Sequence, residues 1–250
     1  MKAIILAAGQ GKRLFPLTSE CPKAMLDIGG KTIIDRQISL FKENGINDVI
    51  IIKGYKPDSV KSAYDFRCYL NENYGSTNMV HTLFCAESEF DDEVVVSYGD
   101  IIYSDQVLKP ILKSKEQISV VVDLDWKEYF TARFGDPYED AESLIFDSSG
   151  LIKSIGESKP NPERILAQYI GLIKFSQAGL NIVKAIYHDA VIKDLSIGWG
   201  RNIKEAYMTD LLQEVIVRGY GIHAIPVHRG WVEIDNIHDY DLANNIISQL

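Results

Sequence analysis

The chain has 250 residues, of which 46% are hydrophobic and 24% are charged, as in an ordinary folded globular protein. Its formal net charge of -9 makes the average surface repel nucleic acids and anionic membranes, so we expect neither as a partner. The three cysteines have no C-x-x-C spacing, which argues against a disulfide framework or a zinc site and favours a reducing compartment.

The first apolar run, residues 3–8, leads directly into the polar stretch GQGKR. This run is too short for the hydrophobic region of a signal peptide and has no cleavage pattern behind it. No apolar stretch of the sequence approaches the length of a membrane span. We therefore expect a cytoplasmic protein.

In the first half, apolar strand-like runs alternate with helical patterns, which predicts a largely parallel sheet. We expect strands at residues 3–8, 49–52, 94–97 and 118–124, and helices at 33–43, 78–90 and after Ser104. The second half is more mixed, with strands expected at 143–146, 151–155, 169–175 and 221–227, and helices at 178–188, 205–218 and from about Asp239. No linker is visible. The pattern predicts an α/β protein with one domain spanning residues 1–250.

A glycine-rich motif, LAAGQGKRL at residues 6–14, follows the first expected strand. Such a turn at the carboxyl end of a strand leaves backbone N–H groups free to bind phosphates, and Lys12, Arg13 and Lys23 add three positive charges nearby. The motif lacks the G-K-[ST] ending of a Walker A loop. Leu14 replaces the third glycine of a dinucleotide fingerprint, so hydride transfer with NAD is unsupported. The alternative is a solvated basic turn.

The longer pattern L-A-A-G-Q-G-K-R-L-x-P-L-T-x-x-x-P-K resembles the signature of the sugar-1-phosphate nucleotidyltransferase superfamily, which includes small-molecule cytidylyltransferases. The resemblance continues at residues 54–55, 98–100, 169–172 and 230–235. It implies a Rossmann-like nucleotidyltransferase fold with a mixed, mostly parallel central sheet flanked by helices. The nucleotide-binding residues that it implies are Leu6, Ala8, Gly9, Gly11, Lys12, Arg13, Lys23, Asn78, Gly99 and Asp100.

The same resemblance implies a metal site formed by Asp100 and Asp235. Mg²⁺ prefers carboxylate oxygens and usually takes one or two of them together with substrate phosphates. An isolated aspartate in such a position would otherwise be a turn or cap residue. Glu233 is two residues from Asp235, on the same side of an extended segment, where it either assists the metal or is an exposed acid. We assign Lys23, Arg13, Asp100 and Asp235 to catalysis.

The segment at residues 71–83, NENYGSTNMVHTL, resembles cytidylyltransferases for phosphocholine and related acceptors rather than the sugar-nucleotide enzymes. Amide and hydroxyl groups such as those in this segment can read the amino and carbonyl groups of cytosine. Asn78 has a second interpretation as the N-cap of the helix that follows, and the two roles can coexist.

The acceptor side is expected at about residues 120–200. Residues 123–142 are rich in aromatic and acidic side chains, a combination that suits an ammonium group. The alternative is that these aromatics are core residues and the acids a solvated surface. Arg133 would pair with a carboxylate of an amino-acid-like acceptor, and Lys159 resembles a family lysine for the acceptor phosphate or is a plain loop residue. The residues assigned to the acceptor are Trp126, Arg133, Glu139, Lys159, Tyr169 and Glu233.

Together these features predict an Mg²⁺-dependent cytidylyltransferase that moves CMP from CTP to a small phosphorylated acceptor and releases pyrophosphate. The acceptor would be of the phosphocholine, aminoethylphosphonate or phosphoglutamine type. One alternative is a sugar-1-phosphate uridylyl- or thymidylyltransferase. A second is a catalytically inactive nucleotide-binding sensor. Whether the chain forms a homo-oligomer stays open.

Overall fold

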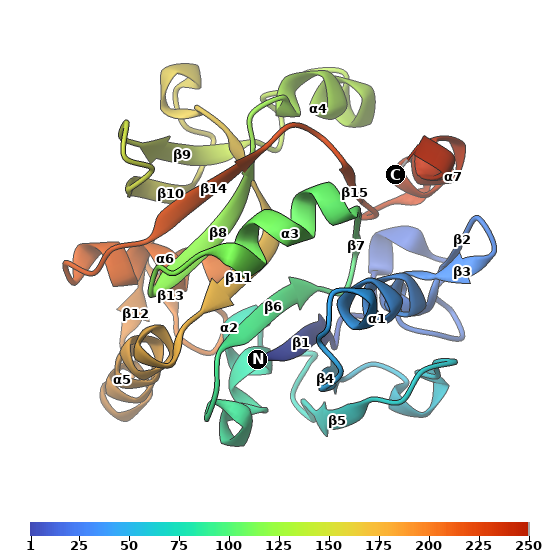
Figure 1. Cartoon of the computed structure of the whole chain (residues 1–250), viewed down its shortest axis with the longest axis horizontal. Coiled ribbons are helices and arrows are strands. Elements are labelled where there is room, and N and C mark those ends of the chain that lie inside the picture. Colours follow the sequence, from blue (N-terminus) through green and yellow to red (C-terminus); the bar gives the residue numbers. More distant parts are fainter. Residues whose placement is uncertain (250) are drawn as a thin grey trace.

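The structure is a computed structural model and describes residues 1–249 (Figure 1). At its centre is a seven-stranded sheet in the order β14-β8-β11-β6-β1-β4-β5. All neighbouring strands are parallel except β11, which is antiparallel to both β6 and β8. The strands are β1 (Lys2–Ala7), β4 (Val49–Lys53), β5 (Arg67–Leu70), β6 (Val94–Tyr98), β8 (Ile118–Asp123), β11 (Gln168–Phe175) and β14 (His223–Val227). The predicted mixed, mostly parallel sheet is confirmed.

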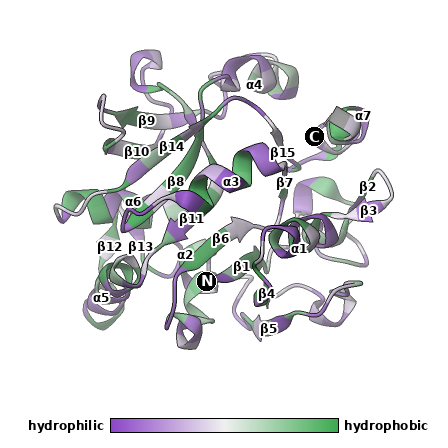
Figure 2. Cartoon of the chain, viewed as in Figure 1, coloured by the Kyte–Doolittle hydropathy of each residue, from purple (hydrophilic) through white to green (hydrophobic). Residues whose placement is uncertain are grey.

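The central strands are apolar over most of their length because both faces of the sheet are covered. In β1, Ile4 and Leu6 belong to one apolar cluster, whereas Ala3 and Ile5 belong to the cluster on the opposite face. Figure 2 shows hydrophobic residues concentrated in β1, β6 and β8, with hydrophilic residues in the surrounding loops. The sheet therefore separates two hydrophobic cores, and its strand ends are held rigidly between them.

Helices cover the two faces of the sheet. One core contains residues of α1 (Ile33–Glu43), α3 (Asp105–Lys113), α4 (Trp126–Phe134) and α7 (Ile237–Ile246). The other contains residues of α2 (Met79–Phe84), α5 (Gln177–Lys193) and α6 (Met208–Val217). Side-chain caps fix where four of them begin: Thr32, Asn78, Ser176 and Asn236 each accept a hydrogen bond from a backbone N–H in the first turn. The arrangement has three layers, with helices on either side of the sheet.

Four small antiparallel pairs surround the sheet. They are β2 (Asp27–Ile28) with β3 (Lys31–Thr32), β7 (Ile101–Tyr103) with β15 (Trp231–Glu233), β9 (Glu142–Phe146) with β10 (Ile152–Ser158), and β12 (Ser196–Ile197) with β13 (Arg201–Asn202). Figure 1 shows the β9–β10 hairpin and α4 at the top of the molecule, away from β4 and β5. The β7–β15 pair matters most for the site, because it joins the segment after β6 to the segment before α7.

The structure differs from the sequence-based expectation in several places. The helix expected at 78–90 ends at Phe84, and a separate 3₁₀ turn follows at Glu87–Glu89. The helix α4 and the short strands β5, β7 and β15 were not predicted. Within residues 1–249, no helix is both long enough and apolar enough to cross a bilayer.

Candidate active site

The glycine-rich motif forms a tight turn at the carboxyl end of β1. Gly11 has φ 69°, a left-handed conformation that favours glycine, and a Cβ there would lie 2.9 Å from the Cβ of Lys23. The hydroxyl of Thr18 donates to the carbonyl of Gly11 over 3.0 Å and ties the turn to the segment that follows. The turn is therefore held close to Lys23, which begins a 3₁₀ turn after Pro22.

A cavity of about 260 Å³ opens beside this turn. Its walls come from the ends of β1 and β6, from Lys23 and Ala24, and from the segment between β5 and α2. The lining residues are Leu6, Ala7, Ala8, Gly9, Gly11, Lys23, Ala24, Tyr74, Thr77, Asn78, Met79, Thr82, Gly99 and Asp100. Eight of the ten residues expected to bind the nucleotide are in this set; the other two, Lys12 and Arg13, are exposed.

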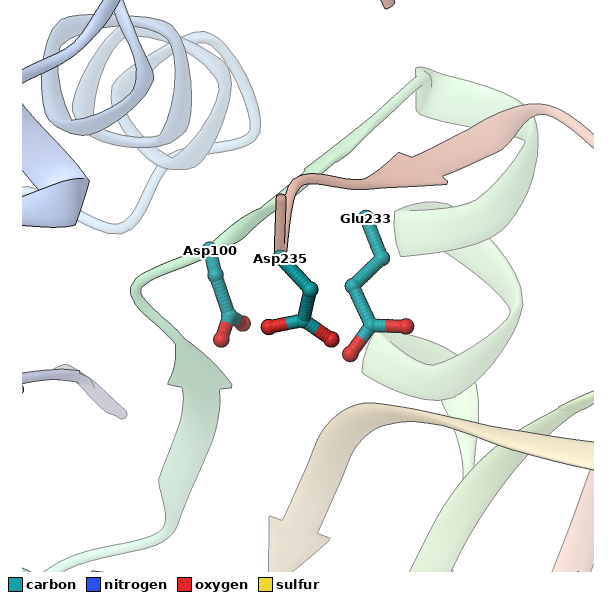
Figure 3. A group of neighbouring side chains, drawn as sticks. All are labelled: Asp100, Glu233 and Asp235. Carbon is teal, nitrogen blue, oxygen red and sulfur yellow. The ribbon is translucent and has the colours of Figure 1, made fainter. Parts of the chain in front are cut away.

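Asp100, which lines this cavity, forms an acidic cluster with Glu233 and Asp235 (Figure 3). One carboxylate oxygen from each residue lies within 4.8 Å of the others. The pairing of β7 with β15 brings them together, and the N–H of Ile234 donates to the carbonyl of Asp100 over 3.0 Å. Figure 3 shows the carboxylates of Asp100 and Asp235 directed toward one another, with Glu233 alongside.

Lys23 is the central cation of the cluster. Its Nζ lies 2.6 Å from Oδ2 of Asp100 and 2.6 Å from Oδ1 of Asp235. Burial by itself would lower the pKa of Lys23, but the two carboxylates raise it above its ordinary value, so the side chain stays charged. Burial would likewise raise the pKa of Asp235; Lys23, followed by Arg13 and Arg133, instead lowers it. Lys23 and Asp235 therefore each stabilise the charged form of the other.

Oδ1 of Asp100 is buried and finds no hydrogen-bond partner among the described residues. Burying a carboxylate oxygen without a hydrogen-bond partner destabilises the folded protein. A cation bound beside the oxygen would remove that destabilisation. The oxygens of Asp235 and Glu233 lie next to it. This set of hard oxygen ligands fits a magnesium ion.

Arg133 forms ion pairs with two carboxylates of the cluster. Its side chain on α4 is 1% exposed, and it pairs with Asp239 over 3.0 Å, with Glu233 over 2.5 Å and with Asp235 over 3.4 Å. Its guanidinium is thus engaged by three carboxylates of this chain. The binding of an acceptor carboxylate by Arg133 stays a prediction; in the structure Arg133 pairs with Glu233 and Asp235.

A second cavity of about 300 Å³ adjoins the first, and Met79 lines both. Its lining combines aromatic rings with three carboxylates and contains neither lysine nor arginine. The residues are Met79, Tyr98, Phe130, Asp140, Glu142, Gln168, Tyr169, Tyr207, Thr209 and Glu233. Two cavities that meet at one side chain provide room for two substrates.

Two of the residues expected on the acceptor side, Tyr169 and Glu233, line this second cavity. Trp126 is 1% exposed in the hydrophobic core, which matches the alternative interpretation of that residue. Glu139 and Lys159 are exposed and are not part of the lining.

The sequence analysis did not assign Asp140 and Glu142, although both lie in the acidic stretch that it singled out. Neither has an ion-pair partner in the described part of the chain, so the cavity has uncompensated negative charge. Burial, followed by the charges of Asp140 and Asp210, raises the pKa of Glu142 to about 7. A cationic group bound in this cavity would lower the pKa of Glu142 again.

Residues 2–249 match the protein family described as Nucleotidyl transferase. The chain belongs to this family. It is 37% identical to the CTP:phosphoglutamine cytidylyltransferase of Campylobacter jejuni, over 97% of this chain and 98% of that protein. It is 31% identical to the choline-phosphate cytidylyltransferase of Streptococcus pneumoniae, over 99% of this chain and 98% of that protein. The resemblance predicted from the motifs is confirmed.

The fold agrees with this family assignment. A solved structure of CTP:phosphocholine cytidylyltransferase from Streptococcus pneumoniae superposes with a TM-score of 0.74 at 23% identity and covers 98% of each chain. A glucose-1-phosphate thymidylyltransferase structure from Bacillus anthracis gives a TM-score of 0.76 at 21% identity, covering 100% of this chain and 96% of that one. At these identities the superpositions establish the shared nucleotidyltransferase fold.

Removing the central cation should destabilise the protein. In a Lys23→Met variant, Asp100 and Asp235 would face each other without it, and breaking a buried ion pair in this way costs about 3 kcal/mol. Urea denaturation at pH 7 with a metal chelator present measures the loss. Lys12→Met, at an exposed position in the same motif, is the matched control and should change stability little. Equal stability of the two variants would contradict the role of Lys23.

The raised pKa of Glu142 predicts how stability depends on pH. The unfolded chain ionises this carboxyl near 4.5, whereas the folded protein holds the proton until about pH 7. Between these values the folded state binds more protons, so stability falls as pH rises from about 5 to 8. Over this pH range, the free energy of unfolding should fall by about 1–2 kcal/mol less in Glu142→Gln than in wild type, after allowance for solvent screening.

Denaturation midpoints of wild type and Glu142→Gln across this pH range measure the difference. Glu139→Gln removes an exposed acid of the same segment and should preserve the wild-type pH profile. Parallel profiles for wild type and Glu142→Gln would show that Glu142 does not titrate in this range.

Proposed function

We propose that this protein transfers CMP from CTP to a small phosphorylated acceptor that carries a cationic amine, and releases pyrophosphate. The observation that carries the proposal is that the two cavities meet beside Lys23 and the acidic cluster. The first cavity is lined by the glycine-rich turn, and the second is lined by carboxylates. The two relatives, a CTP:phosphoglutamine cytidylyltransferase and a choline-phosphate cytidylyltransferase, support both the nucleotide and the class of acceptor. Such an enzyme would work in the cytoplasm, where CTP is available.

Mg²⁺ is the metal that the acidic cluster fits. Asp100 and Asp235 would hold it, with Glu233 beside them, and the buried free oxygen of Asp100 supports this assignment. The ion would supply charge neutralisation on the phosphates. Lys23 already bridges the two aspartates, so lysine and ligands are arranged before any substrate binds.

The residues of the chain act chiefly by positioning and by charge. The backbone of the turn at Gly9 and Gly11 faces the first cavity, where it can bind the triphosphate. An oxygen of the acceptor phosphate forms a bond to the α-phosphorus as the bond to pyrophosphate breaks. That oxygen is already anionic, so no general base is required. Lys23, assisted by the exposed Arg13, stabilises the charge that moves onto the leaving pyrophosphate.

We propose that the segment at residues 71–83 reads the base. Asn71 is 1% exposed, and its Nδ2 donates to the hydroxyls of Thr77 and Thr82, both over 3.0 Å. Asn78 is the N-cap of α2: its Oδ1 accepts from the N–H of Met79 over 2.8 Å. Within residues 1–249, Nδ2 of Asn78 has no hydrogen-bond partner, and the residue lines the first cavity. A free donor at this position suits the acceptor atoms N3 and O2 of cytosine.

The second cavity favours a cationic acceptor. Asp140, Glu142 and Glu233 face rings from Tyr98, Phe130, Tyr169 and Tyr207, and no lysine or arginine belongs to this lining. Ion pairing and cation–π contact both favour an ammonium group there. Since the cavity adjoins the metal cluster through Glu233, an amine bound in it would place the acceptor phosphate near the reaction centre.

Removing either proposed magnesium ligand should abolish turnover without unfolding the protein. We expect Asp100→Asn and Asp235→Asn each to lower kcat at least about a hundredfold, because charge stabilisation in the transition state is lost. Pyrophosphate release with added Mg²⁺, compared with excess chelator, measures activity, and circular dichroism reports folding. Asp241→Asn, an exposed position on α7, is the control. Wild-type turnover in either folded variant would remove that residue from the proposed site.

CTP should be preferred strongly over UTP. Uracil presents a donor at N3 and a carbonyl at position 4 where cytosine presents an acceptor and an amino group, so buried polar groups would be mispaired. One or two such mismatches cost about 1–3 kcal/mol each, which corresponds to roughly ten- to ten-thousand-fold in kcat/KM. Competition between CTP and UTP with an active acceptor tests the preference. Equal use of both, or a preference for UTP or dTTP, would favour a sugar-nucleotide enzyme.

A further inference from the structure

Arg201, on β13, is not part of the second cavity's lining but stacks against a residue that is. Its guanidinium carbon is 4.4 Å from the centre of the Tyr207 ring, and Tyr207 lines the cavity. Nη1 of Arg201 pairs with both carboxylate oxygens of Asp210, at 3.1 and 3.2 Å. The Asp210 side chain is fully buried and also accepts from the backbone N–H of Tyr207 over 2.9 Å. Arg201 is therefore anchored at one edge and stacked on one face.

The other edge of this guanidinium is free. Among residues 1–249, Nε and Nη2 of Arg201 make no hydrogen bond, while 39% of the side chain is exposed. These two nitrogens form the pair of parallel donors that binds a carboxylate through both oxygens. Arg201 also acts electrostatically on Glu142, whose raised pKa it partly offsets. The guanidinium with this open edge is therefore close enough to the cavity to interact electrostatically with Glu142.

The polar groups of the cavity favour an amine that has N–H donors. The hydroxyl of Tyr169 is buried and finds no hydrogen-bond partner of good geometry in the described part of the chain. Glu142 and Asp140 are acceptors without a cationic partner. A trimethylammonium group offers no N–H to any of them, whereas a primary ammonium group has three donors. Burying these oxygens against methyl groups would leave them unpaired.

We propose that the acceptor is a phosphorylated amino acid, with its ammonium group bound by Asp140 and Glu142 and its carboxylate bound by the free edge of Arg201. This inference rests on the proposed function and names the acceptor class for the same site. Arg201 would then determine specificity: it separates acceptors that carry a carboxylate from simple phosphorylated amines. Three carboxylates of the chain already engage Arg133, so this role is assigned to Arg201.

A matched pair of acceptors tests the proposal. O-phospho-L-serine differs from O-phosphoethanolamine only by the carboxylate, and phosphocholine differs from the latter by three methyl groups. We expect wild-type kcat/KM, from pyrophosphate release with CTP, to fall in the order phosphoserine, phosphoethanolamine, phosphocholine. Arg201→Gln should lower kcat/KM for phosphoserine about thirtyfold and for phosphoethanolamine less than about threefold, because only phosphoserine loses a charged hydrogen-bond pair.

Three further variants sharpen the test. Arg201→Lys keeps the charge but not the paired donors, so it should recover only part of the phosphoserine activity. Glu142→Gln should lower kcat/KM for both amines, since each depends on the ammonium site. Arg218→Gln, which removes an arginine paired with Glu214 on α6, should alter neither value.

If Arg201→Gln lowers kcat/KM equally for both acceptors, Arg201 is only a structural partner of Asp210 and the proposal is overturned. A wild-type preference for phosphoethanolamine or phosphocholine would also overturn it. Calorimetric titration of phosphoserine and phosphoethanolamine into wild type and Arg201→Gln tests the carboxylate site without turnover. If CTP is not used but phosphoserine still binds more tightly to wild type than to Arg201→Gln, the proposed function fails while the carboxylate site stands. If CTP is consumed with phosphoethanolamine and phosphoserine does not bind, the proposed function stands and the carboxylate site fails.

Discussion

The site depends on a charge cluster in which carboxylates outnumber cations. Four carboxylates, from Asp100, Glu233, Asp235 and Asp239, are paired with two buried cations, Lys23 and Arg133. Like charges this close are tolerated only when compensated, and burial followed by the charge of Asp235 raises the pKa of Glu233. The excess negative charge explains why a divalent cation suits the cluster. Before substrate binds, Lys23 pairs with both Asp100 and Asp235 and keeps the two side chains aligned.

The cluster is assembled by pairing between distant segments, and this limits what the sequence can reveal. Asp100 follows β6, and Asp235 follows β15; only the β7–β15 pairing shows that they touch. The motifs predicted both aspartates because the family resemblance placed them. They could not predict that an arginine of α4 completes the cluster, since the Arg133–Asp239 contact joins residues 106 positions apart. The positions of the main strands along the chain and the glycine-rich turn were predictable, because hydrophobic periodicity and residue type are local signals.

A local signal for α4 was present in the sequence. Trp126, Tyr129, Phe130 and Arg133 recur at the three- and four-residue spacing of one helix face, and all four are buried. Their aromatic and charged character suggested a ligand pocket instead, and the helical period was overlooked. Arg133 shows why composition misled: a long cationic side chain in an aromatic segment serves a ligand or a buried ion pair equally well. Burial and partner geometry decide between these roles, and neither can be read from one segment.

The two halves of the reaction are supported by different parts of the fold. The strand ends of β1 and β6, with Lys23, line the first cavity, which we propose binds the nucleotide, and are held between the two cores. The second cavity, proposed for the acceptor, is built largely from β9, β11, the start of α6 and the segment that precedes it. Tyr207, Thr209 and Asp210 connect this side to α6, so its rim is anchored by a helix start rather than by the central sheet. Substitutions around β13 and α6 can therefore change which acceptor binds while the charge cluster keeps its geometry.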